Sequence, residues 1–127
     1  MQRNFILLFI LINAMFISSS TNAQKNSYYM RIARLTIDSV QLTDYQIALK
    51  EAMETAIKIE PGVISFNAVY NKKQLNHITI FETYADEKAY QIHIQTPHFK
   101  KYKEKVANMV QTLELIDVNT LAYFSKD

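Results

Sequence analysis

The chain of 127 residues contains no cysteine, no tryptophan, one glycine and two prolines. The lack of cysteine excludes disulfides, lipid attachment at a cysteine and a catalytic thiol. With a single glycine, the chain has neither a glycine-rich loop for nucleotide phosphates nor the Gly-x-Ser-x-Gly motif of acyl-transfer enzymes. It also lacks a flexible linker, so its length and composition indicate one globular domain.

Neither sign of charge dominates, because 14 lysines and arginines face 12 acids, for a formal charge of +2. The only basic cluster is predicted to lie on the solvent-exposed side of a helix and consists of Lys100, Lys101, Lys103 and Lys105. The balance is unlike that of a nucleic-acid-binding protein, so we expect no nucleic-acid partner.

The first 23 residues differ in kind from the rest. Arg3 precedes an apolar run at 5–17, which is followed by small polar residues ending at Ala23. This three-part pattern predicts a cleaved signal peptide at 1–23 and a mature domain at 24–127 that is periplasmic or secreted. The apolar run is short for a membrane span, so we expect no membrane attachment after cleavage. An uncleaved N-terminal anchor is the alternative.

Apolar periodicity in the rest of the chain predicts strands and helices in a recognisable order. The predicted elements are a strand at 28–37, a helix ending near Ile59, strands at 63–70 and 78–84, two helical segments separated at Pro97, and a strand at 115–124. This order predicts an α+β fold of the ferredoxin-like split β-α-β type, with an antiparallel sheet and helices on one face.

Local signals set the predicted element boundaries. Glu60, Pro61 and Gly62 end the first helix, because proline disfavours a helical residue before it and glycine suits the turn. Asp86 is the predicted N-cap of the next helix. Thr96 and Pro97 are predicted as N-cap and first residue of the last helix. Its apolar stripe is expected to continue from Phe99 through Tyr102, Val106 and Met109 or Val110 to Leu113.

The strands carry apolar residues on both faces. In the strand at 63–70, one face is predicted to hold Ile64, Phe66, Ala68 and Tyr70, while Val63 and Val69 lie on the other. Phe81 likewise opposes Ile80. A sheet with one solvated face normally shows polar residues there, so we expect a second copy to cover it in a homodimer.

The segment 80–102 holds the strongest candidates for chemistry. Glu82 shares a strand face with Ile80 and Tyr84, and His93 lies on the apolar side of a helix. Imidazole titrates near pH 6.5 and is the natural general base, so His93 is the first candidate. Glu82 is predicted to bind its far ring nitrogen. Alternatively, this pair merely fastens helix to sheet.

Other candidates carry plainer alternatives. His98 is a third catalytic candidate, although a capping or surface role suits its place beside Pro97. The five-residue separation of His93 and His98 across a helix break disfavours a metal site, so we expect no metal. Six aromatic residues are candidates for the lining of a flat substrate pocket, with core packing as the alternative: Tyr45, Phe66, Tyr84, Tyr90, Phe99 and Tyr102.

Several of these segments together resemble the antibiotic biosynthesis monooxygenase superfamily, and within it the small proteins classed with quinol monooxygenases. The resemblance covers nearly all of 24–127 and is carried by Glu60-Pro61-Gly62, Phe66, Phe81-Glu82-Thr83-Tyr84, Asp86, Ala89-Tyr90 with His93, and Thr96-Pro97-His98-Phe99. It implies a dimeric α+β barrel with a pocket between sheet and helices in each protomer. The haem-degrading branch has a pocket tryptophan, which this chain lacks.

The resemblance implies a cofactor-independent monooxygenase that oxidises a small quinol or other electron-rich aromatic with O2, and the predicted signal peptide adds that it is exported. The implied partners are the aromatic substrate, O2 and a second copy of the chain. Fold alone does not decide the activity. A non-enzymatic ligand-binding or stress-related dimer and a proton-transfer isomerase using His93 and Glu82 therefore remain alternatives.

Overall fold

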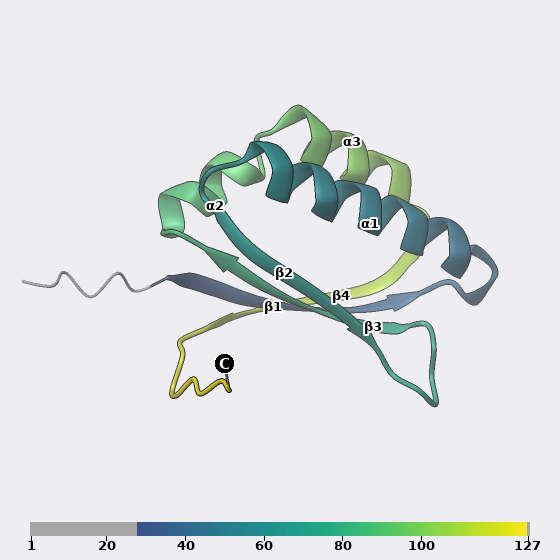
Figure 1. Ribbon diagram of the computed structural model, residues 1–127. Helices are drawn as coiled ribbons and strands as arrows, with labels where there is room; N and C mark the ends of the chain where they lie inside the picture. Colours follow the sequence, from purple (N-terminus) through teal and green to yellow (C-terminus); the bar gives the residue numbers. More distant parts are fainter. Residues whose placement is uncertain (1–27, 127) are drawn as a thin grey trace, which may run out of the picture.

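The computed structural model describes residues 28–126, in which helices cover one face of a four-stranded antiparallel sheet (Figure 1). The strands lie in the order β2-β3-β1-β4, with bounds β1 (Tyr29–Ile37), β2 (Val63–Tyr70), β3 (His77–Tyr84) and β4 (Val110–Val118). The helices are η1 (Ser39–Gln41, a 3-10 turn), α1 (Leu42–Ile59), α2 (Glu87–His93) and α3 (Pro97–Val106). The predicted ferredoxin-like α+β fold is confirmed.

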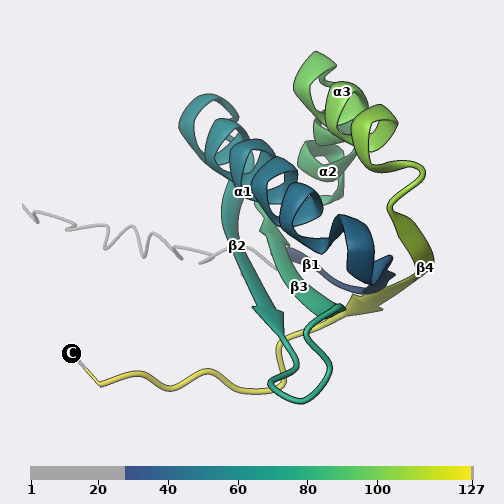
Figure 2. The same ribbon diagram turned by 90° about the vertical axis from the view of Figure 1, so that its right-hand side faces the viewer.

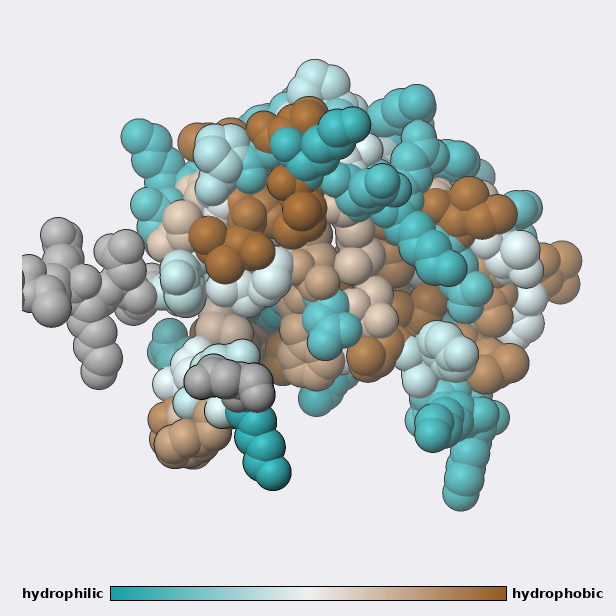
Figure 3. All heavy atoms as spheres, viewed as in Figure 1, coloured by the Kyte–Doolittle hydropathy of each residue, from teal (hydrophilic) through white to brown (hydrophobic). Residues whose placement is uncertain are grey.

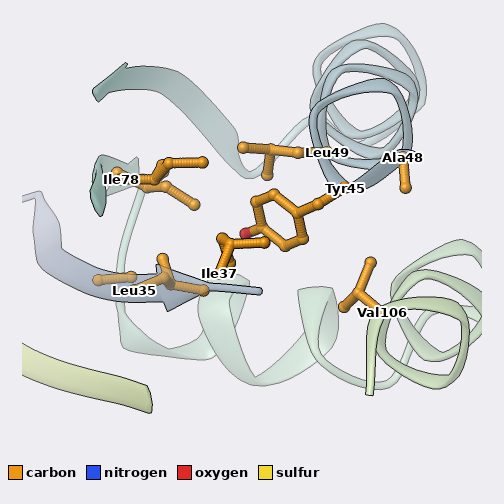
Figure 4. Close-up of a cluster of buried hydrophobic side chains, with 9 residues drawn as sticks. Leu35, Ile37, Tyr45, Ala48, Leu49, Ile78 and Val106 are labelled. Carbon is orange, nitrogen blue, oxygen red and sulfur yellow. The ribbon is translucent and has the colours of Figure 1, made fainter. Parts of the chain in front are cut away.

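The helical layer is fixed to the sheet by apolar packing. Figure 2 shows α1 and α3 side by side above the strands. The larger core cluster joins β1, β3 and both of these helices, and includes Leu35, Ile37, Tyr45, Ala48, Leu49, Ile78 and Val106 (Figure 4). Full burial of one large apolar side chain contributes about 1.5–3 kcal/mol, so this cluster is what holds the helices on the sheet.

Capping residues mark the starts of α2 and α3 as predicted. Asp86 Oδ1 accepts a hydrogen bond of 2.7 Å from the backbone N–H of Ala89. Thr96 Oγ1 accepts from the backbone N–H of Phe99 at 3.3 Å, and Pro97 is the first residue of α3. Both caps satisfy N–H groups that the first helical turn leaves without partners. The cap at Thr96 therefore ends the short connection that separates the two helices.

The predicted boundary between the last helix and the last strand is wrong. α3 ends at Val106, and β4 begins at Val110 rather than at 115. Leu113 is therefore a strand residue, and it pairs with Leu35 of β1. Apolar residues from 106 to 115 suit both a helical and a strand period, and neither glycine nor proline marks the change. Pairing with β1, which is distant in sequence, decides the conformation.

The predicted faces of β2 are partly wrong, because the strand contains an irregularity. Val63 pairs with Tyr84, but Ser65 pairs with Thr83, so the register shifts between them. Val63 consequently packs in the same small core cluster as Phe66, on the helix-facing side, instead of opposite to it. A bulge reverses the alternation of side chains, and a strand without glycine or proline gives no sequence signal of it.

Gly62 is required for a reason other than the one predicted. Within the described residues, no glycine has a positive φ, so the turn itself does not demand glycine. A Cβ at Gly62 would instead lie 2.5 Å from Cβ of Ala89 in α2, well inside van der Waals contact. Gly62 therefore permits the close approach of α2 to the end of α1.

Among residues 28–126, no helix has the length and apolar character needed to cross a bilayer. The predicted signal peptide at 1–23 lies outside the described residues.

Candidate functional site

A cavity of about 110 Å³ lies between the helices and the sheet. Its wall is mostly apolar, and the polar side chains along it include Arg31, Glu82, Tyr84, His93, His98 and Tyr102. An apolar cavity of about 150 Å³ accepts a benzene molecule. This cavity is smaller than that, so an aromatic ligand would extend through its open side.

Two histidines of the cavity wall, His93 and His98, meet the carboxylate of Glu60. His93 Nδ1 lies 2.9 Å from Glu60 Oε2, and His98 Nε2 lies 2.6 Å from the same oxygen. The side chains of Glu60 and His93 are each 9% exposed, and that of His98 is 19% exposed. One buried carboxylate oxygen thus accepts from two imidazoles, which fixes the orientation of both rings.

The chain brings these residues together through the ends of three helices. Pro61 stops α1, so Glu60 adopts an extended conformation as its C-cap. His93 is the last residue of α2, and His98 is the second residue of α3. Between them, Thr96 Oγ1 donates to the backbone carbonyl of His93 at 2.7 Å. The short connection therefore turns both imidazoles toward Glu60.

The predicted hydrogen bond between Glu82 and His93 is absent from the described structure. Glu82 Oε2 instead accepts from the Tyr84 hydroxyl at 2.8 Å, on the same face of β3. Glu60, which was not among the predicted site residues, is the partner of His93. A signal was available, because an acid at the C-terminus of a helix opposes the helix dipole and so calls for another explanation.

Glu82 retains a place in the cavity wall. Burial is the main cause that raises the pKa of its carboxyl above the ordinary value, while the Tyr84 hydroxyl and the nearby His93 and Arg31 act in the opposite direction. Burial and the neighbouring Glu82 also raise the pKa of the Tyr84 hydroxyl, which therefore remains a hydrogen-bond donor at physiological pH. Glu82 and Tyr84 can therefore present either a hydrogen-bond donor or a negatively charged carboxylate to a ligand.

Aromatic rings surround the imidazole of His93. The ring centroids of Phe66, Tyr84 and Phe99 lie 5.6, 5.5 and 4.9 Å from that of His93, and Tyr90 packs on Tyr84 at 5.3 Å. All four aromatic residues line the cavity, as predicted from the sequence. Their flat surfaces exclude water from the ring and suit an aromatic ligand.

The two remaining predicted pocket residues lie differently. Tyr102 lines the cavity, whereas Tyr45 is fully buried in the larger core cluster and does not. Their hydroxyls are hydrogen-bonded at 2.9 Å. Tyr45 therefore supports Tyr102 from behind, and burial raises the pKa of both hydroxyls.

Arg31 is a cavity residue that the sequence analysis did not select. Its guanidinium lies 4.6 Å from the ring centroid of Tyr90, and its Nε is 2.9 Å from Asp117 Oδ1. The alignment with Asp117 is too poor for a hydrogen bond, so the buried Nε has no such partner among the described residues. Arg31 could have been selected from the sequence, because it is a charged residue in a strand of mostly apolar residues.

The cluster of Glu60, His93 and His98 also has the composition of a metal site. One ligand atom from each residue lies within 4.8 Å of the others. The sequence analysis disfavoured a metal because the helix break was expected to separate the two histidines. That premise is wrong, since the break is what brings them to the same carboxylate.

Comparison with known proteins is consistent with this geometry. The model of the antibiotic biosynthesis monooxygenase family matches residues 28–105. A protein of Bacteroides thetaiotaomicron VPI-5482 named for that family has a solved structure that is 48% identical, with a TM-score of 0.75, and the match covers 80% of this chain and 96% of that one. No curated protein matches the chain.

More distant structures share the fold. A Lactobacillus acidophilus NCFM protein named as a monooxygenase is 27% identical with a TM-score of 0.71, over 76% of this chain and 45% of that one. A Nitrosomonas europaea protein named for the same family is 18% identical, also with a TM-score of 0.71, over 76% and 93%. The resemblance predicted from the sequence is confirmed, and the chain belongs to the antibiotic biosynthesis monooxygenase family.

Proposed function

We propose that this protein is a cofactor-independent monooxygenase that oxidises a small quinol or related electron-rich aromatic with O2. The observation that carries the proposal is the contact of 2.9 Å between His93 Nδ1 and the buried Glu60 carboxylate, at the wall of an aromatic cavity. A carboxylate in this position favours the tautomer with a proton on Nδ1. Nε2 is then the free acceptor and can take a proton from a phenolic hydroxyl.

The reaction begins with that proton transfer. The imidazolium formed on His93 is stabilised by Glu60, and the substrate anion gives an electron to O2 more readily than the neutral phenol does. Recombination of the two radicals forms a carbon–oxygen bond, and the resulting peroxide takes back the proton held on His93. The O–O bond then breaks as the ring hydrogen and the outer hydroxyl leave as water, which leaves a carbonyl. The ring C–H, the phenolic proton and O2 thus yield a ring C=O and H2O, so the substrate supplies all the electrons and no external reductant is needed.

Two other cavity groups have roles in this scheme. The Tyr84 hydroxyl, which donates to Glu82 at 2.8 Å, can donate to a developing oxyanion instead. Arg31 supplies a positive charge at the same wall, at 12% side-chain exposure. A low-dielectric cavity strengthens both interactions relative to water. These groups favour an anionic intermediate over the neutral substrate.

A proton-transfer isomerase is a second candidate, and the environment of Glu82 favours it. Burial raises the pKa of Glu82, while Glu60 orients His93 as a base at the same cavity. A carboxyl whose protonated form is favoured and an imidazole base at one cavity can move a proton between two carbons of one substrate. This activity would exchange substrate hydrogen with solvent and consume no oxygen.

Oxygen uptake separates these possibilities. We expect a panel of benzoquinols and naphthoquinols to include a compound whose oxidation is accelerated by the protein. His93→Gln should lower that rate about 10²–10⁴-fold, the usual contribution of a general base. His77→Gln is the matched control, because His77 is exposed on β3 and lies outside this cavity. Equal rates for both variants and wild type would refute the assignment of His93.

We further propose that the protein is a homodimer. Phe81 and Val69, on the sheet face opposite to the helices, are 42% and 44% exposed, and Leu121 and Phe124 after β4 are 101% and 93% exposed. Brown apolar surface also interrupts the polar surface visible in Figure 3. A second copy would cover such residues. Sedimentation equilibrium at micromolar concentration should give twice the monomer mass, and a monomer mass would contradict the proposal.

Export is the last part of the proposal and rests on the sequence of residues 1–23. Protein expressed with its full sequence should be recovered from the periplasm or medium with Gln24 as its first residue. Recovery of material that still begins at Met1 would contradict cleavage.

A further inference from the structure

We propose that Glu60, His93 and His98 form a binding site for a divalent late first-row transition metal ion, with Zn2+ as the best fit. The site uses the residues of the proposed function but does not require that function. Two imidazole nitrogens and one carboxylate oxygen are a ligand set typical of zinc sites that keep a further position open. Mg2+ and Ca2+ prefer oxygen ligands, so the two nitrogens select against them.

The distances permit the ion with small movements. The nitrogens now lie 2.9 and 2.6 Å from Glu60 Oε2, which are hydrogen-bond separations around protons. A tetrahedral Zn2+ with bonds of about 2.0–2.2 Å requires its ligand atoms to lie about 3.3–3.5 Å apart. Because the three ligand atoms already lie within 4.8 Å of one another, shifts of about 1 Å in the side chains suffice.

The charge and burial of Glu60 favour replacement of the ring protons by a metal ion. The Glu60 carboxylate is 9% exposed, and its contacts in the described structure are the two imidazoles. A divalent ion would replace the protons that these rings donate and would place positive charge beside a desolvated negative one. His93 and His98 both line the cavity, so a water or substrate oxygen that enters it can take the remaining coordination position.

The ion and the proposed proton transfer exclude each other. Coordination occupies Nδ1 of His93, and the neutral ring then carries its proton on Nε2. His93 can no longer accept a proton from the substrate. Bound Zn2+ is therefore expected to inhibit the oxidation proposed above, while metal binding itself can be measured without substrate or oxygen.

Co2+ titration of the wild-type protein tests the site, because tetrahedral Co2+ absorbs visible light. We expect one Co2+ per chain, displaced by one Zn2+. His98→Ala and Glu60→Gln should each weaken binding by more than about 100-fold, since even loss of a supporting contact costs 10–100-fold. His77→Ala should bind as wild type does. Equal affinity in all four proteins would overturn the proposal.

Wild-type NMR keeps the test valid if a variant fails to fold. The chain has three histidines, and only His77 lies outside the cluster. One equivalent of Zn2+ should shift the ring signals of His93 and His98 and leave those of His77 unchanged. No shift at millimolar Zn2+ would disprove the site even if oxygen uptake were observed. Shifts without any oxygen uptake would support the site and leave the proposed oxidation unsupported.

Discussion

Replacement of Glu60 by glutamine should destabilise the protein by about 2 kcal/mol. The carboxylate accepts two hydrogen bonds, of 2.9 and 2.6 Å, from side chains that are largely buried. Hydrogen bonds to a charged group contribute about 1.5–3 kcal/mol each, and neutral ones about 0.5–1.5. Glutamine keeps the shape and one acceptor oxygen, so the expected loss is about 1 kcal/mol for each bond.

Urea denaturation followed by circular dichroism measures this change in the free energy of unfolding. In thermal denaturation, a loss of about 1 kcal/mol lowers the melting temperature of a domain of this size by about 4–8 °C, so the melting temperature should fall by about 8–16 °C. Glu54→Gln is the control, because Glu54 is exposed on the same helix and should change stability by less than about 0.5 kcal/mol.

Coupling between the residues provides the sharper form of this test. In a double-mutant cycle, Glu60→Gln and His98→Gln should be non-additive by about 1 kcal/mol, because they share one hydrogen bond. The combination of Glu54→Gln with His98→Gln should be additive. If Glu60→Gln behaves like Glu54→Gln, or if the cycle shows no coupling, the buried carboxylate does not hold the imidazoles as described.

Three further predictions concern the surroundings of the site. Gly62→Ala should cost about 1–3 kcal/mol in urea denaturation, because its Cβ would meet that of Ala89, and adding Ala89→Gly should recover most of the loss; no recovery would contradict the packing argument. Burial raises the pKa of Glu82, so the contribution of this residue to wild-type stability should be fully present below the ordinary pKa of about 4.5 and be lost as pH rises through the folded value. Glu82→Gln should therefore gain stability relative to wild type between pH 4 and 7, and a constant difference would refute this. Thr96→Ala removes the cap of α3 and should cost about 1 kcal/mol, whereas an unchanged urea midpoint would show that the cap is dispensable.

Sequence reasoning located most elements of the fold because their boundaries carry local signals. Asp86 and Thr96 cap α2 and α3, and β2 begins and ends where its apolar run does. The start of β4 at Val110 was missed because only its pairing with β1 distinguishes it from a helix. The predicted face of Val63 was wrong for a similar reason, because a bulge depends on pairing with the neighbouring strand.

Most residues of the candidate site were predicted from the sequence, but the hydrogen bond that joins His93 to its acid was not. Alternation along β3 correctly placed Glu82 and Tyr84 on one face, and the helical period correctly turned His93 toward the cavity. The identity of the acid bound to His93 was wrong, because Glu60 and His93 are brought together by the arrangement of α1 and α2. Contacts between helix ends depend on tertiary packing, which neither alternation nor spacing along the chain encodes.

The central claim is that Glu60 holds His93 with a proton on Nδ1 and leaves Nε2 free to act as a base. Nitrogen-15 NMR of the imidazole rings in the wild-type protein at pH 8 tests it most directly. The account predicts that Nδ1 of His93 is protonated and Nε2 is not, and that Glu60→Gln shifts the ring toward a mixture of tautomers. A proton found on Nε2 in the wild type, or a tautomer that does not respond to Glu60→Gln, would contradict it.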